Sequence, residues 1–197
     1  IYNNSIFNKY KILVMKYKIA INGFGRIGRL TLRALLDKDL GNIEVVAIND
    51  LGPIDANIHL LKYDSIHGFF DKKFNVIDNT LKFERNEILF LKESNPEKLN
   101  WNKHNVDLVI ECTGIFTKRE DAEKHLQSGA KRVLISAPAT NPDITVVYGI
   151  NESEQYKLNN IFPYIDGKAS ISRTARFFPT YWIFKPAMFL TSFLLIK

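Results

Sequence analysis

The sequence predicts an α/β fold of the Rossmann type, in which a mostly parallel β-sheet carries helices on both faces. An apolar strand at residues 18–21 runs directly into the glycine-rich segment 22–28. A strand followed by such a loop and then a helix is typical of dinucleotide-binding domains. Strand and helix patterns alternate from there to Gly149, as expected for consecutive βαβ units.

The individual elements follow from the spacing of apolar residues and from the turn residues between them. Helices are expected from the glycine loop to about Leu40, and then over residues 53–62 and 119–127. A hairpin is expected over residues 73–83 because Asp78, Asn79 and Thr80 separate two strand patterns. The remaining strands are expected at residues 43–48, 87–91, 107–111, 132–136 and 144–147.

Three glycines, Gly23, Gly25 and Gly28, form the pattern Gly-x-Gly-x-x-Gly. In this motif the first glycine permits a tight turn, the second lets a pyrophosphate approach the backbone, and the third lets helix and strand pack closely. The helix N-terminus adds partial positive charge for the anion. Asp50 ends the next strand, about 20 residues further on, where a carboxylate can accept hydrogen bonds from the adenosine ribose.

The basic charge of the chain is a property of its two ends. The formal net charge is +6, but residues 15–160 contain 20 basic and 20 acidic residues. Residues 161–197 carry five basic residues against Asp166 alone, together with nine aromatic residues. The neutral domain gives little support for a nucleic-acid surface. An alternative that stays open is a non-catalytic binding module that uses the basic, aromatic tail to engage nucleic acid or an acidic partner.

Cysteine and hydropathy exclude several further classes of protein. The one cysteine, Cys112, excludes an intramolecular disulfide framework and fits the reducing cytoplasm, where we expect the chain to reside. One cysteine and four scattered histidines do not supply a zinc site. The apolar run 187–196 is shorter than the about 20 residues that a membrane span requires. A membrane attachment through residues 180–196 is therefore a minor alternative.

Several separate segments occur in the order and spacing of one family. They are Asn22-Gly-Phe-Gly-Arg-Ile-Gly-Arg29, Ala47-Ile-Asn-Asp-Leu51, Leu60-Leu-Lys-Tyr-Asp-Ser-Ile-His-Gly68, Glu111-Cys-Thr-Gly-Ile-Phe-Thr-Lys118 and Gly129-Ala-Lys-Arg-Val-Leu-Ile-Ser-Ala-Pro138, and residues 144–151 continue the match. Over residues 16–160 the chain resembles phosphorylating glyceraldehyde-3-phosphate dehydrogenase. Asp50 favours this family over the erythrose-4-phosphate dehydrogenases, which usually carry Glu at that position.

The resemblance implies NAD as the cofactor and a set of contacts to it. Arg26 and Ile27 would offer main-chain N–H groups to the pyrophosphate, and Asp50 would bind the adenosine ribose. A carboxylate at that position also opposes the additional phosphate of NADP. Thr113 and Gly114 would lie along the path of the cofactor.

Two serines complete the contacts implied by the resemblance. Ser136 would contact the cofactor near its nicotinamide end, and Ser94 occupies a position where many members of the family have Arg. The family uses a main-chain group at the position of Ser94, so the change removes only a side-chain contribution.

The resemblance stops near residue 160, before the family's nucleophilic cysteine, catalytic histidine and substrate domain. No cysteine follows Cys112, and we expect Cys112 and His67 to have structural roles. The reaction needs a thiolate that attacks the aldehyde and a base that assists hydride departure. We therefore expect an NAD-binding part that lacks the catalytic α+β domain and is inactive alone. Glyceraldehyde 3-phosphate and phosphate would be partners only with a catalytic domain present, and the family's homotetramer is doubtful here.

Three regions are expected along the chain. Residues 1–14 precede Met15 and are interpreted as an upstream leader that is not native. Residues 15–160 form the NAD-binding Rossmann domain. Residues 161–197 form a tail unlike the family, which a frameshift or truncation would explain.

Overall fold

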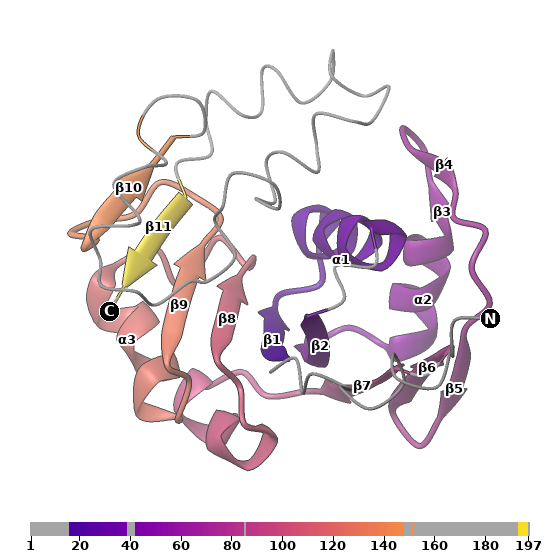
Figure 1. Cartoon of the computed structure of the whole chain (residues 1–197), viewed down its shortest axis with the longest axis horizontal. Coiled ribbons are helices and arrows are strands. Elements are labelled where there is room, and N and C mark those ends of the chain that lie inside the picture. The colour runs from indigo at the N-terminus through magenta and orange to yellow at the C-terminus, as the bar shows by residue number, and fades with distance from the viewer. Residues whose placement is uncertain (1–15, 39–41, 85, 148–150, 152–192, 197) are drawn as a thin grey trace, which may run out of the picture.

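The computed structural model describes residues 16–38, 42–84, 86–147 and 151, and the backbone of residues 193–196 (Figure 1). The leader expected at residues 1–14 lies outside the described residues, as does the tail expected at residues 161–197 apart from that short backbone segment. Among the described residues, no helix is long and apolar enough to cross a membrane.

A mixed β-sheet forms the centre of the described structure. Its strand order is β10-β11-β9-β8-β1-β2-β7-β6-β5. The parallel strands are β1 (Tyr17–Asn22), β2 (Ile43–Asn49), β7 (Asn86–Leu91), β8 (Leu108–Glu111) and β9 (Arg132–Ile135). The antiparallel strands at the two edges are β5 (Asn75–Ile77), β6 (Thr80–Phe83), β10 (Ile144–Val146) and β11 (Phe193–Ile196). The predicted Rossmann-type, mostly parallel sheet is confirmed.

Helices cover both faces of this sheet, as the sequence predicts (Figure 1). α1 (Arg26–Lys38) and α2 (Ile54–Lys62) pack on the face that includes Ile21 of β1. α3 (Arg119–Gln127) packs on the opposite face, where its Ala122 meets Val133 of β9. Because neighbouring residues of a strand point to opposite faces, Ala20 of β1 belongs to this second face.

Two short 3₁₀ helices complete the second face. η1 (Pro96–Lys98) and η2 (Trp101–His104) follow β7, and the indole of Trp101 packs in a cluster with Ala20 and Val109. The small side chains of Ala20 and Ala47 leave room for this indole between the sheet and η2. The expected elements contained no 3₁₀ helix, because a single turn leaves no apolar periodicity to detect.

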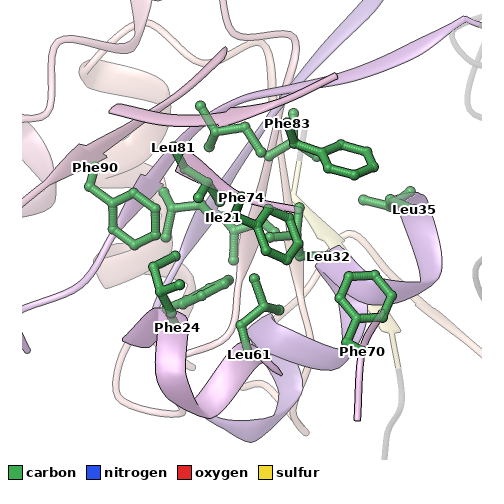
Figure 2. Close-up of a cluster of buried hydrophobic side chains, with 14 residues drawn as sticks. Ile21, Phe24, Leu32, Leu35, Leu61, Phe70, Phe74, Leu81, Phe83 and Phe90 are labelled. Carbon is green, nitrogen blue, oxygen red and sulfur yellow. The ribbon is translucent and has the colours of Figure 1, made fainter. Parts of the chain in front are cut away.

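The largest apolar cluster lies between the sheet and the first two helices. Figure 2 shows Leu32 and Leu35 of α1 and Leu61 of α2 together with side chains of the β5–β7 region. Phe24 and Phe90 meet edge to face, with ring centroids 5.6 Å apart, a preferred geometry for aromatic pairs. This cluster fixes α1, and with it the glycine loop that precedes α1, against the sheet.

The hairpin expected over residues 73–83 is present as β5 and β6, and its turn residues Asp78 and Asn79 both have positive φ. Such a pair of positive φ angles matches the right-handed twist of the two strands. A second hairpin, β3 (Tyr63–Asp64) and β4 (Gly68–Phe69), was not expected. Its strands of two residues each are too short to show an alternating pattern.

Two neighbouring leucines on α2 provide a test of the packing between α2 and the sheet. Leu61 is fully buried, whereas Leu60 is 44% exposed. We expect Leu61→Ala to lower the free energy of unfolding by about 2–5 kcal/mol, because it leaves a cavity in the largest cluster. Leu60→Ala should change this free energy by less than about 0.5 kcal/mol. Urea unfolding of the two variants, followed by circular dichroism, measures both values, and equal destabilisation would contradict this packing.

Candidate dinucleotide-binding site

The residues predicted to contact a cofactor gather where the parallel strands end. The loops after β1, β2, β7, β8 and β9 lie at the edge of the sheet that is formed by the carboxyl ends of its parallel strands. Open α/β sheets bind their ligands at this edge. The loops are also joined directly. The N–H of Gly23 donates to the carbonyl of Asn49 (2.8 Å), and the N–H of Cys112 donates to the carbonyl of Asn22 (2.7 Å).

The three glycines of the loop stand in three different environments. Gly23 has a φ of +89°, and a Cβ atom there would lie 2.7 Å from the Thr113 nitrogen. A Cβ on Gly28 would lie 2.2 Å from the carbonyl oxygen of Gly23. A Cβ on Gly25, in contrast, would meet nothing within 4 Å. Gly23 and Gly28 therefore permit close packing inside the protein, whereas Gly25 leaves the outer surface of the loop open.

The open side of the loop is also the N-terminus of α1. The N–H of Arg29 donates to the carbonyl of Gly25 (3.0 Å) and makes the first hydrogen bond of the helix. The N–H groups of Arg26 and Ile27 lie before that bond, and both residues are exposed. No acidic residue occupies the first turn of α1. This end of the helix is therefore suited to an anion.

Asp50 connects the loop after β2 to the glycine loop. Its Oδ2 accepts a hydrogen bond from the N–H of Phe24 (2.8 Å). Its Oδ1 accepts hydrogen bonds from the N–H of Gly52 (2.8 Å) and from Nδ2 of Asn57 (3.0 Å). Burial raises the pKa of Asp50, but these three hydrogen bonds and the nearby Arg29 outweigh burial and lower it. The carboxylate is thus held in its charged form at the place where a ribose is expected.

The loops after β8 and β9 bring Thr113, Gly114 and Ser136 to the same edge. The N–H of Thr113 donates to Oε1 of Glu111 (2.8 Å), and the hydroxyl of Thr113 donates to the same oxygen. Gly114 is exposed and has a φ of +72°. Both the N–H and the hydroxyl of Ser136 donate to the carbonyl of Glu111 (2.9 Å each). The ends of β8 and β9 are therefore fixed to each other.

Ser94 lies in the exposed loop after β7. The preceding residue is fixed to β2, since the N–H of Glu93 donates to Oδ1 of Asn49 (2.9 Å) and Nδ2 of Asn49 donates to the carbonyl of Glu93 (2.8 Å). The structure thus places all the predicted contact residues at one edge of the sheet, on loops or in the first turn of α1. The set is Gly23, Gly25, Arg26, Ile27, Gly28, Asp50, Ser94, Thr113, Gly114 and Ser136.

Buried polar residues support these loops and were not predicted as part of the site. Asn22, Asn49 and Glu111 end strands β1, β2 and β8, and each is at most 5% exposed. Their hydrogen bonds reach Thr113 and the loop at Glu93. The signal in the sequence is a polar residue at the end of an apolar strand, which is uncommon in a buried sheet.

Cys112 and His67 were expected to have structural roles, and the contacts of each are as follows. The thiol of Cys112 is desolvated although the residue as a whole is only partly buried, and this burial raises its pKa to about 12. Such a thiol is protonated at neutral pH and is a poor nucleophile. His67 orders a loop, since its N–H donates to Oδ1 of Asp64 (2.8 Å) and its Nδ1 lies 3.0 Å from the same oxygen. Among the described residues, no group of three or more His, Cys, Asp or Glu side chains could hold a metal ion.

The comparisons with known proteins identify one family. Residues 17–119 match the family model for the glyceraldehyde 3-phosphate dehydrogenase NAD binding domain. Glyceraldehyde-3-phosphate dehydrogenases of Xanthobacter flavus and Geobacillus stearothermophilus are 51% and 53% identical to the chain over 140 residues. The enzyme of Mycoplasma pneumoniae is 55% identical over 135 residues.

These alignments cover much of the chain but a smaller part of each relative. They include 71%, 71% and 68% of this chain, respectively, and 42%, 41% and 40% of the relatives. The chain thus matches about two-fifths of the length of these relatives.

The contrast between Gly28 and Gly25 can be tested by adding one methyl group at each position. Gly28→Ala should lower the free energy of unfolding by about 1–3 kcal/mol, because the methyl group collides with the Gly23 carbonyl and displaces α1. Gly25→Ala should change it by less than about 0.5 kcal/mol. Thermal and urea unfolding measure both variants, and a larger loss of stability for Gly25→Ala would contradict the geometry of the loop.

The hydrogen bonds to Asp50 predict a dependence of stability on acid pH. Because the folded pKa of Asp50 lies below the value of about 3.9 for an unfolded chain, the unfolded state binds more protons between the two values. This contribution to stability is complete above the unfolded pKa and is lost as the pH falls through the folded pKa. The stability difference between the wild type and Asp50→Asn should therefore shrink below about pH 4. The exposed Asp71→Asn serves as the control and should follow the wild type in acid unfolding curves.

Proposed function

Because the chain belongs to the family of the glyceraldehyde 3-phosphate dehydrogenase NAD-binding domain, we propose that it is the cofactor-binding part of such an enzyme. NAD is the cofactor of this domain. The observation that carries the proposal is the hydrogen bond of 2.8 Å between the N–H of Phe24 and Asp50, which joins the glycine loop to the ribose carboxylate beside the open Gly25.

We propose the following division of contacts along the dinucleotide. The pyrophosphate binds against Gly25 and the N–H groups of Arg26 and Ile27, while Gly23 and Gly28 shape the loop from within. This assignment is supported by the open space at Gly25 and by the free end of α1. Asp50 binds the adenosine ribose.

The nicotinamide half is proposed to extend over the loops after β7, β8 and β9. Ser94 contributes through its main chain, Thr113 and Gly114 lie along the cofactor, and Ser136 lies near the nicotinamide. Support for these roles comes from the hydrogen bonds that hold all three loops at the same edge of the sheet.

The charge of Asp50 selects NAD over NADP in this proposal. All three hydrogen bonds to the carboxylate come from the protein's own N–H groups, so the negative charge is neutralised only in part. An additional phosphate on the ribose would be repelled at short range. The ribose hydroxyls of NAD, in contrast, donate hydrogen bonds to a carboxylate.

The complete reaction is proposed for the enzyme of which this chain forms a part. NAD, when bound, supplies the hydride acceptor for oxidation of glyceraldehyde 3-phosphate, and phosphate then cleaves the enzyme-bound acyl group. The thiolate is proposed to belong to the catalytic domain, because burial raises the pKa of the only cysteine of the chain to about 12. The base is proposed for the same domain on the resemblance to the family alone. The chain alone is therefore proposed to bind NAD without turnover. The homotetramer of the family is proposed only for the complete enzyme.

The proposed domain spans residues 15–160, and the proposed location is the cytoplasm, where the thiol of Cys112 stays reduced. The alternative of a binding module that uses the tail gains no support from the comparisons. Basic and acidic residues balance in residues 15–160, so we expect no specific nucleic-acid partner for this domain.

The proposal predicts cofactor selectivity that depends on Asp50. Calorimetric titration of the 197-residue chain should detect NAD binding and weaker binding of NADP. Asp50→Asn should weaken NAD binding roughly tenfold and reduce the preference for NAD, because the charged acceptor is lost. The exposed Asp71→Asn is the matched control and should bind as the wild type does.

Two results would overturn the proposed function. One is an absence of NAD binding by the folded wild-type chain, and the other is an equal affinity for NADP. Formation of an acyl phosphate by the purified chain would contradict the division of labour between the two domains.

A further inference from the structure

A hydrogen-bonded network of buried polar side chains lies beneath the candidate site and has no role in the proposed cofactor contacts. Trp101 of η2 and His125 of α3 have no exposed surface. Glu111 at the end of β8 and Asn22 at the end of β1 are each 1% exposed. Buried polar groups lower stability unless each finds a hydrogen-bond partner. The hydrogen-bond partners of these four side chains therefore determine which of their atoms donate and which accept.

The indole of Trp101 determines which nitrogen of His125 carries the proton. Nε1 of Trp101 lies 3.0 Å from Nδ1 of His125. An indole N–H only donates, so Nδ1 must be the acceptor and the proton of the neutral ring lies on Nε2. This Nε2–H points to Oε2 of Glu111 at 3.0 Å. Trp101 thus makes His125 a donor to Glu111.

Glu111 collects four donors on its two oxygens. Oε2 accepts from Nε2 of His125 and from Nδ2 of Asn22 (2.6 Å). Oε1 accepts from the N–H and the hydroxyl of Thr113. The contact of 3.4 Å between Asn22 and His125 joins two donors that share Oε2 and is not a hydrogen bond. Four donors match the capacity of an ionised carboxylate.

The network of hydrogen bonds continues from Asn22 to the loop after β7. Oδ1 of Asn22 accepts a hydrogen bond from Nδ2 of Asn49 (2.7 Å), and Oδ1 of Asn49 accepts one from the N–H of Glu93 (2.9 Å). Each amide has only one orientation that suits all these partners. The direction of every bond therefore follows from Trp101 and from the charge of Glu111.

We propose that His125 is a positioning residue for dinucleotide binding, acting through Glu111 on the loops that carry Thr113 and Ser94. This inference rests on the proposed function. Neither His125 nor Trp101 touches the open side of the site. The network that they begin ends at main-chain groups of site loops, the N–H of Thr113 and the N–H of Glu93. A histidine that only filled the core would need partners for its own two nitrogens, but not a continuous path of hydrogen bonds from those partners to the main chain of the site loops.

The test compares two variants of the face that α3 covers. His125→Phe keeps the ring but removes both nitrogens. Val133→Ala creates a cavity under α3 without a polar change, since Val133 is fully buried against Ala122. At a temperature where both variants are folded, His125→Phe should bind NAD about tenfold more weakly than Val133→Ala. Equal affinities of these two variants would overturn the proposal.

Two further measurements separate positioning from simple stability. His125→Gln keeps an N–H donor for Glu111 and should recover most of the NAD affinity. In the wild type, the indole N–H resonance of Trp101, identified by its loss in Trp101→Phe, should move when NAD saturates the site. An indole resonance that stays unchanged at saturation would also overturn the proposal, even if His125→Phe does not fold.

The network can also be judged without NAD. In the cofactor-free protein, His125→Phe should shift the amide resonances of Thr113 and Glu93, whereas Val133→Ala should leave both in place. Unshifted resonances in His125→Phe would refute the positioning role. If the wild-type chain does not bind NAD but these shifts occur, the proposed function fails while the link from His125 to the loops stands.

Discussion

The close contact between the start of α1 and the end of β1 is the constraint on which the rest of the structure depends. No side chain fits between them, because a Cβ on Gly28 would lie 2.2 Å from the Gly23 carbonyl. This contact directs the N-terminus of α1 over the edge of the sheet. It also brings the N–H of Phe24 to Asp50 at the end of β2. The glycine loop is thus held both by the close packing of Gly28 on Gly23 and by the hydrogen bond to the charged Asp50.

The candidate site has partial positive charge at the N-terminus of α1 and negative charge at Asp50. The end of α1 presents partial positive charge and lacks acidic residues in its first turn. Asp50 presents a full negative charge, which hydrogen bonds and Arg29 maintain by lowering its pKa against the effect of burial. An anionic pyrophosphate and a neutral, hydroxyl-bearing ribose fit these two places. A phosphate beside Asp50 would be repelled by the carboxylate.

The sequence was sufficient to predict the helices and strands in which apolar residues recur with a regular period. Apolar runs and turn residues located the five parallel strands and the three α-helices, and the three glycines with Asp50 indicated the candidate site. The hairpin of β3 and β4 and the two 3₁₀ helices were missed because each strand or helix is too short for its pattern to repeat.

The support beneath the site could not be predicted for a different reason. Asn22, Glu111 and His125 are far apart in the sequence, and only the pairing of β1 with β8 and the packing of α3 bring them together. Periodicity reports which face of an element is buried. It does not report which polar side chains meet there.

The loops of the candidate site are ordered without a ligand, for two reasons. The glycine loop is fixed by packing that involves no ligand, and the loops at Glu93 and Thr113 are fixed by side chains from the interior. A site whose loops are already ordered loses little conformational entropy when its ligand binds. The described residues supply this order themselves, without a bound ligand. The same loops enclose Cys112, where burial raises the pKa of the thiol to about 12, so that the thiol is protonated at neutral pH and is a poor nucleophile.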